Sequence, residues 1–207
     1  MEKLDLAKKY KPYFTAKIKP ELVDIETAQF ISLTGKGDPS DINFSEKIQA
    51  LYATAYAIKF IHKALGQDFV VSKLECLWWF DTRQFGQPSI SEIPQKVNRK
   101  EWEFRLLIRM PDYLSQVDLE KSISTVIAKK KTGVAQEIEF VEMKEGMAVQ
   151  MLHIGPFATE PESLEQMEKF LISKGLSKNG HHHEIYLSDF NKTDPARLKT
   201  ILRQPVR

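Results

Sequence analysis

Glu184 and Tyr186, two ionisable side chains near the end of the sequence, are spaced so that they could act together. Residues 184–187 are typical of a β-strand, in which alternate side chains share a face. We expect Ile185 and Leu187 to point toward the helices, which directs Glu184 and Tyr186 to the opposite face. Because a carboxylate on an apolar surface is costly to desolvate, Glu184 is either a solvated residue of an edge strand or a cleft residue that can take a proton from water.

Aromatic side chains are expected to form the walls of such a cleft. Trp78 and Trp79 are consecutive, so in a regular strand only one of them can fill the helix-side core, and we assign Trp79 to the pocket. The other expected wall residues are Trp102 on an adjacent strand, Tyr52 and Tyr56 one helical turn apart, and Phe157 after a Gly-Pro turn. The alternative for all of them is an ordinary core position.

The histidines and the single cysteine offer weaker signals. His181, His182 and His183 are adjacent, so in a strand-like run they alternate sides and cannot converge on one ion. We therefore expect a solvated turn and no metal site. His153 ends a strand just before Gly155-Pro156, which suits either the rim of a cleft or a structural role. Cys76 is flanked by apolar residues, which indicates an inert core thiol.

The elements that must position these residues are indicated by hydrophobic periodicity. Apolar residues recur at alternating spacings of four and three over 44–65, which predicts a helix that Gly66 ends. Further helices are expected near 118–130 and 164–174. Strands are expected at 28–33, 74–80, 102–108, 137–143, 147–153 and 184–187, with a short turn at 144–146 and a long exposed loop at 82–100.

The order of these elements repeats. A strand, a glycine-bearing turn, a capped helix and then strands occur over about 28–109 and again over about 147–187. This order predicts a single α+β domain over residues 1–207. It consists of two strand–helix–strand–strand units whose antiparallel sheets meet, with the helices packed on one face. The groove between the units is the expected ligand site.

The composition excludes several classes of function. The 207 residues carry 30 Lys and Arg against 28 Asp and Glu, so the net charge of +2 argues against direct nucleic-acid binding. The chain lacks the apolar stretch of a membrane span or signal peptide, and its one cysteine suits a reducing compartment, so we expect a cytoplasmic protein. A phosphate-binding glycine loop is missing, no cofactor is expected, and nothing specifies an oligomeric state.

Three segments resemble the GyrI-like small-molecule-binding family: MLHIGPF at 151–157, the helix at 163–171 and HEIYLSD at 183–189. The segment LECLWWF at 74–80 resembles a longer, stand-alone subgroup. The resemblance implies two strand–helix–strand–strand units that form a concave, aromatic-lined pocket, with the family's buried glutamate at Glu184. Phe190 departs from the proline that is common after the final aspartate. No helix-turn-helix is visible, so the architecture of the family's transcription regulators is absent.

The stand-alone subgroup includes hydrolases of cyclopropanoid DNA-alkylating compounds, and this implies a detoxification role. In that hypothesis Glu184 activates water, Tyr56 or Tyr186 donates toward the developing phenolate, and Trp79, Trp102 and Phe157 hold a planar hydrophobic ligand. Two alternatives stay open. One is a non-catalytic protein that sequesters drugs, with Glu184 as a counter-charge, and the other is a modulator that interacts with gyrase.

Overall fold

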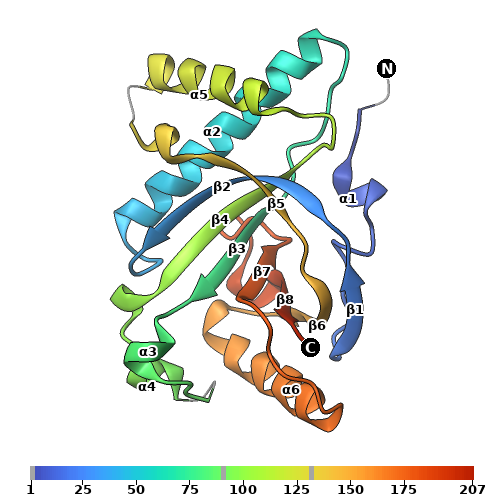
Figure 1. Cartoon of the computed structure of the whole chain (residues 1–207), viewed down its shortest axis with the longest axis vertical. Helices are drawn as coiled ribbons and strands as arrows, with labels where there is room; N and C mark the ends of the chain where they lie inside the picture. The colour runs from blue at the N-terminus through green and yellow to red at the C-terminus, as the bar shows by residue number, and fades with distance from the viewer. Residues whose placement is uncertain (1–2, 90–91, 131–132) are drawn as a thin grey trace.

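The computed structural model describes residues 3–89, 92–130 and 133–207, and it has the predicted α+β class. Eight antiparallel strands form one sheet in the order β1-β6-β8-β7-β3-β4-β2-β5, with the long helices on one face (Figure 1). The strands are β1 Glu21–Ile25, β2 Ala28–Lys36, β3 Leu74–Trp79, β4 Glu103–Met110, β5 Glu139–Met143, β6 Gly146–Ile154, β7 His182–Tyr186 and β8 Lys199–Pro205. The α-helices are α1 Leu6–Lys9, α2 Ile42–Ala64, α3 Thr82–Phe85, α4 Ile93–Lys96, α5 Gln116–Lys130 and α6 Glu160–Ser173.

The sheet is built from two units with the same element order, β2-α2-β3-β4 and β6-α6-β7-β8. The units meet where β3 pairs with β7, with Cys76 opposite Glu184. The predicted second unit stopped at residue 187 and missed β8, which lies between β6 and β7 and completes the unit. The lysines and arginines after residue 190 obscure the apolar positions Ile201 and Leu202, both of which are fully buried.

Two long bent segments join the units. β1 runs into β2 and β5 runs into β6, yet the members of each pair lie in different halves of the sheet. The short turn expected at 144–146 is therefore a bend: β5 pairs with β2, whereas β6 pairs with β1 and β8. Gly146 has φ +66 at this bend, a left-handed value that glycine adopts without strain.

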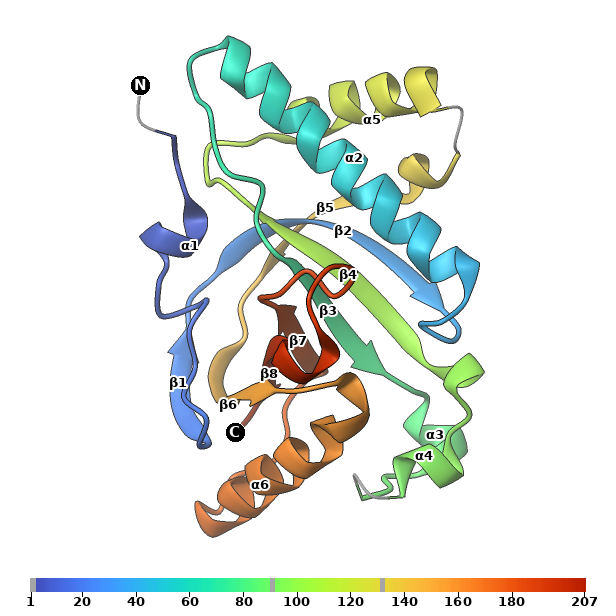
Figure 2. The same cartoon turned by 180° about the vertical axis from the view of Figure 1, so that it is seen from behind.

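The long helices α2, α5 and α6 cover one face of the sheet. The buried side of α2 packs on β2, β3 and β4 through Leu51, Ala55 and Ile58, and α5 packs beside it. In the other unit, Met167 and Leu171 of α6 pack on the apolar residues of β6 and β8. The segment that follows β7 crosses the space between α2 and α6 (Figure 2). This space lies over the junction of the two units.

The opposite face of the sheet is also covered, by the N-terminal segment. Tyr13 and Phe14 are buried there against Leu107 and Ile185. The expectation that Ile185 faces the helices is therefore wrong: Ile185 faces the N-terminal segment, and Glu184 and Tyr186 face the helices. Both faces of β7 are covered by other parts of the chain, so the alternation of the strand does not reveal which side the helices occupy.

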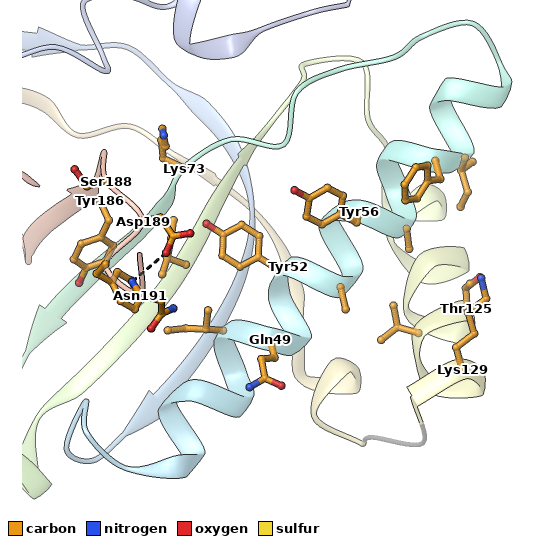
Figure 3. Close-up of a pocket in the computed structure, with 18 residues that line it drawn as sticks. Gln49, Tyr52, Tyr56, Lys73, Thr125, Lys129, Tyr186, Ser188, Asp189 and Asn191 are labelled. Atoms are coloured by element: carbon orange, nitrogen blue, oxygen red, sulfur yellow. Dashed lines mark hydrogen bonds between the residues drawn. The ribbon is translucent and has the colours of Figure 1, made fainter. Parts of the chain in front are cut away.

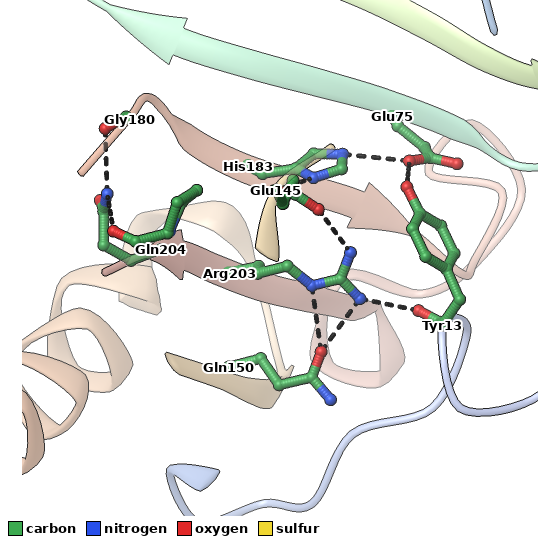
Figure 4. Close-up of polar contacts among 9 residues, drawn as sticks. Tyr13, Glu75, Glu145, Gln150, Gly180, His183, Arg203 and Gln204 are labelled. Atoms are coloured by element: carbon green, nitrogen blue, oxygen red, sulfur yellow. Dashed lines mark hydrogen bonds and ion pairs between the residues drawn. The ribbon is translucent and has the colours of Figure 1, made fainter. Parts of the chain in front are cut away.

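A buried polar network on this second face ties the N-terminal segment to both units (Figure 4). His183 Nδ1 lies 2.9 Å from Glu145 Oε1 and its Nε2 lies 3.0 Å from Glu75 Oε2, which also accepts a hydrogen bond from the Tyr13 hydroxyl. Arg203 pairs with Glu145 at 2.9 Å and donates to the Tyr13 carbonyl. The expected solvated histidine turn is thus wrong at His183, whose side chain is fully buried.

The connection over 82–100 is not the irregular loop that its glycine and prolines suggested. It contains α3, α4 and a short 3-10 helix, Arg99–Glu101, that leads into β4. Residues 90 and 91 of the predicted loop lie outside the described residues. Among the residues that the structure describes, no helix is both long and apolar enough to cross a membrane.

Candidate functional site

Glu184 lies on β7 at the junction of the two units, with only 13% of its side chain exposed. Strand alternation places Glu184, His182 and Tyr186 on the helix-covered face. The Tyr186 hydroxyl donates a 2.7 Å hydrogen bond to Glu184 Oε2, and His182 Nε2 lies 3.4 Å from Oε1. Burial and the nearby Glu184 charge hold the pKa of Tyr186 well above its usual range, so the phenol keeps its proton and acts as a donor.

Trp78, and not Trp79, belongs to this site. Trp78 Nε1 donates to the Tyr186 hydroxyl at 3.3 Å, and its ring meets the Trp102 ring edge-on at 5.7 Å. The assignment of Trp79 to the pocket is wrong because the register puts Cys76 opposite Glu184, which gives Cys76 and Trp78 the helix-side face. Trp79 points to the other face, where it stacks on His181 at 4.4 Å.

Two phenylalanines cover Tyr186 from the side of α6. Phe157 meets the Tyr186 ring edge-on at 5.8 Å, and Phe190, from the segment after β7, does so at the same centroid distance. Phe157 and Phe190 also contact each other at 6.1 Å, so the three rings form one cluster. The sequence predicts Phe157 as a wall residue, whereas the place of Phe190 in the cluster is not predicted. Phe157 is 42% exposed, so the cluster opens to solvent on that side.

A groove of about 980 Å³ runs along α2 from this cluster (Figure 3). Tyr52, Tyr56 and Phe60 recur every four residues along one wall of the groove, which is the spacing of side chains that share a helix face. Tyr186, Asp189 and Phe190 line one end, and Thr125 and Lys129 of α5 line the other. Tyr52 is partly buried, and burial raises its pKa to about 12, while Tyr56 is 47% exposed.

Tyr186 connects this groove to the carboxylate. Its ring lines the groove and its hydroxyl contacts Glu184, which is not itself a wall residue. A planar molecule in the groove would therefore meet the aromatic rings first. It would reach Glu184 only beside or beneath the rings of Tyr186, Phe157 and Phe190.

Glu160 is a second carboxyl at this site that the sequence did not reveal. It is the first residue of α6 and only 8% exposed. Its Oε1 is buried and has no hydrogen-bond partner among the described residues. Burial and the charge of Glu184 hold the pKa of Glu160 well above its usual range. A glutamate in a first helical turn is usually a solvated residue that favours the helix dipole, so no sequence signal marks it.

His153 is buried beneath the start of α6. Its Nδ1 lies 2.9 Å from the Ser163 hydroxyl and its Nε2 lies 3.2 Å from the Pro156 carbonyl, so both ring nitrogens contact the segment that positions Phe157 and Glu160. This placement favours the structural role that the sequence left open. Cys76 is buried as expected, and burial raises its thiol pKa well above the usual range. In the described part of the chain, no group of three or more His, Cys, Asp and Glu could hold a metal ion.

Comparisons with known proteins agree with this geometry. Residues 18–207 match the GyrI-like small molecule binding domain. An uncharacterized conserved protein from Listeria innocua is 34% identical over 99% of this chain and all of its own, with a TM-score of 0.88. Two further structures, each described as a hydrolase from Listeria innocua, are 33% identical to this chain, with TM-scores of 0.84 and 0.85. The matches cover 99% and 100% of this chain and all of the other chain in each case. No curated protein matches the chain.

Proposed function

The chain belongs to the GyrI-like family of small-molecule-binding domains, and from this premise we propose that it binds planar apolar molecules and hydrolyses cyclopropanoid DNA-alkylating compounds. The observation that carries the proposal is the contact between Tyr186 and Glu184 among the rings of Trp78, Trp102 and Phe157. The similar structures described as hydrolases support an enzymatic role.

The reaction needs one base and one proton donor. In a spiro-cyclopropane conjugated to a dienone, water attacks a ring carbon and forms a new C–O bond while the strained C–C bond breaks. The electron pair of that bond moves through the ring to the carbonyl oxygen, which becomes a phenolate and then a phenol. Glu184 takes the proton from the attacking water. General-base action of this kind supplies about 10²–10⁴-fold in rate.

Tyr186 is the better placed of the two candidate donors. Its hydroxyl already contacts Glu184, and its raised pKa keeps it protonated until a developing negative charge accepts its hydrogen bond. Tyr56 lies on the wall of the same groove and is the alternative donor. Tyr52, Tyr56 and Phe190 of the groove wall supply the stacking surface for a flat ligand. The rings of Trp78, Trp102 and Phe157 extend this surface around Tyr186. Opening of the ring destroys the electrophile, so the cell would gain protection against a DNA-alkylating drug.

The second candidate function is sequestration of planar drugs without turnover. It is favoured by one observation: in the described residues, neither Glu160 nor Glu184 forms an ion pair with a lysine or arginine, which leaves a negative site for a cationic ligand. In that role Glu184 is a counter-charge and not a base.

Product counting separates the two functions. The protein is incubated with a large excess of a spirocyclopropyl cyclohexadienone, and the ring-opened phenol is measured over time. We expect product to exceed the amount of protein many times over. If the free compound falls by only one equivalent and no phenol accumulates, the protein sequesters the compound. This result contradicts hydrolysis.

A further inference from the structure

A second hollow, of about 440 Å³, lies where β6 ends and α6 begins, and among the described residues it shares no wall residue with the groove along α2. β1 pairs with β6 from Gly146 to Gln150, and the Leu152 N–H donates to the Lys17 carbonyl. Beyond this point the end of β6 forms one wall of the hollow, and the start of α6 forms another. The hollow is therefore distinct from the proposed small-molecule site.

A serine and a histidine meet in the wall of this second hollow. The Ser163 hydroxyl, near the start of α6, lies 2.9 Å from Nδ1 of His153 on β6, and both residues line the hollow. Their exposed fractions are only 7% and 5%, so little water surrounds the contact. A hydroxyl within hydrogen-bond reach of an imidazole is the arrangement that activates a serine nucleophile. This activation requires that the imidazole face the hydroxyl with its basic nitrogen.

The contacts that hold His153 in place also fix its tautomer. Nε2 lies 3.2 Å from the Pro156 carbonyl, which can only accept a hydrogen bond, so Nε2 carries the ring hydrogen of the neutral imidazole. The Thr159 hydroxyl donates to the same carbonyl at 2.9 Å, and its oxygen lies 3.3 Å from Nε2 as a second acceptor. Nδ1 is therefore the basic nitrogen, and the Ser163 hydroxyl donates to it.

Gly155 leaves the room that these contacts need. It has φ +142, a left-handed value that favours glycine. A Cβ at this position would lie 3.1 Å from Thr159 Oγ1 and 3.5 Å from His153 Nε2. A larger residue would press on the hydroxyl that contacts the imidazole, so the turn before α6 is suited to this arrangement.

We propose that Ser163 and His153 form a second hydrolytic site, which cleaves neutral esters of short apolar acids. The proposal goes beyond the proposed function and does not use Glu184. The exposed side chains of Ile18 and Ile154 line the hollow and suit an apolar acyl chain, and the volume suits a small ester. The carboxylate of Glu162, which is exposed and also lines the hollow, disfavours esters that carry a negative charge.

The reaction is an acyl transfer to Ser163 followed by hydrolysis. Ser163 Oγ attacks the ester carbonyl carbon, and its proton passes to His153 Nδ1. The imidazolium keeps its Nε2–H bond to the Pro156 carbonyl. The C–O bond to the alcohol then breaks, and the leaving oxygen takes the proton from Nδ1. Water attacks the acyl-serine in the same way, which releases the acid and returns the proton to Ser163.

The strand geometry of β6 supplies a backbone donor for the ester carbonyl oxygen. N–H groups of a strand alternate between its two edges, so Ile154 directs its N–H to the same edge as Leu152, whose N–H meets Lys17. The Gly155 N–H donates to the Leu198 carbonyl on the opposite edge, as this alternation requires. Ile18, next to Lys17, lines the hollow. We therefore assign the Ile154 N–H to the developing oxyanion.

A serine-specific reagent tests the site in the wild-type protein. Diisopropyl fluorophosphate transfers its phosphoryl group to the oxygen of an activated serine and releases fluoride. We expect mass spectrometry to locate one modification, at Ser163, and hydrolysis of p-nitrophenyl butyrate to be lost in proportion to it. If Ser163 stays unmodified under a large excess of reagent, or if ester hydrolysis survives full modification, the proposal is overturned.

Three variants assign the roles within the site. Ser163→Ala removes only the hydroxyl, and we expect kcat/KM for p-nitrophenyl butyrate to fall at least about 100-fold. Ser173→Ala, at an exposed position on the same helix, is the matched control and should hydrolyse the ester at the wild-type rate. His153→Asn removes the base, and added imidazole should restore part of its activity, which a purely structural role of His153 would not allow. Thermal denaturation shows whether each variant is folded. Hydrolysis near the wild-type rate in Ser163→Ala overturns the assignment, whether or not His153→Asn folds.

Discussion

The hydroxyl of Tyr186 donates a 2.7 Å hydrogen bond to Glu184 Oε2, two residues away on the same face of β7. This contact joins an aromatic groove to a carboxylate that does not line it, because the Tyr186 ring is part of the groove wall. It places a proton donor and a proton acceptor within one hydrogen bond of each other, next to a surface on which a flat molecule can stack.

Loss of the Tyr186 hydroxyl tests its role as the donor. Tyr186→Phe keeps the ring and removes the hydrogen bond, so we expect the kcat for ring opening to fall about 10²-fold, as when one donor to a developing oxyanion is removed. Binding of N-methylacridone, a planar neutral compound, should change little. Tyr56→Phe is the matched comparison: if it lowers kcat more than Tyr186→Phe does, the proton donor is Tyr56.

The two consecutive tryptophans should behave differently, because β3 directs them to opposite faces of the sheet. Trp78→Phe removes the donor to Tyr186 and part of the stacking surface, so we expect the Kd of N-methylacridone to rise about fivefold to tenfold, or about 1–1.4 kcal/mol. Trp79→Phe should leave the Kd unchanged. Fluorescence titration measures the Kd of both variants. A larger rise in Kd for Trp79→Phe than for Trp78→Phe contradicts the placement of the site.

The buried network on the other face predicts how stability depends on pH. Burial alone lowers the pKa of His183, but Glu145 and Glu75 raise it to about 9. Stability from His183 is therefore complete below its unfolded pKa of about 6.5 and is lost as the pH rises through 9. Burial alone raises the pKa of Glu145, but His183 and Arg203 lower it to about 2, so its contribution is lost as the pH falls from about 4.5 toward 2.

Thermal denaturation over a series of pH values should therefore show a maximum between about pH 4.5 and 6.5 from this network. Glu145→Gln removes the negative charge that His183 and Arg203 share, and we expect a loss of about 3–5 kcal/mol in the free energy of unfolding. Lys178 and Glu168 form an ion pair at the surface, and Glu168→Gln should cost under about 1 kcal/mol. Similar losses in the two variants would mean that the buried network contributes no more than a surface pair.

Glu160 should destabilise the folded protein at neutral pH. Its folded pKa is raised, so the folded state holds a proton that the unfolded state gives up above about pH 4.5, and stability falls as the pH rises through this range. We expect Glu160→Gln to raise the Tm at pH 7 and to change it less at pH 4. A variant that lowers the Tm by the same amount at both values indicates that Glu160 is ionised and stabilising.

Periodicity predicted the helix over α2 and the repeated element order, because these follow from local spacing, whereas a buried glutamate at position 184 was implied only by the family resemblance. Periodicity could not tell which face of β7 meets the helices, since Ile185 is covered by Tyr13 and Phe14 from the distant N-terminal segment. The choice between Trp78 and Trp79 failed for the same reason. The burial of Glu160 depends on how α6 packs on the sheet. The buried Arg203 is paired with Glu145, 58 residues away, and bonds Gln150 and the Tyr13 carbonyl. Local pattern does not record such long-range pairings.

The central claim is that Glu184 is the base for ring opening, and Glu184→Gln tests it most directly. The variant keeps the size of the side chain and removes its basicity. The kcat for a spirocyclopropyl cyclohexadienone and the Kd of N-methylacridone are measured side by side, with Glu165→Gln, at an exposed position on α6, as the control. We predict that kcat falls about 10²–10⁴-fold while the Kd stays within about twofold of wild type. Turnover near the wild-type rate in Glu184→Gln contradicts the assignment.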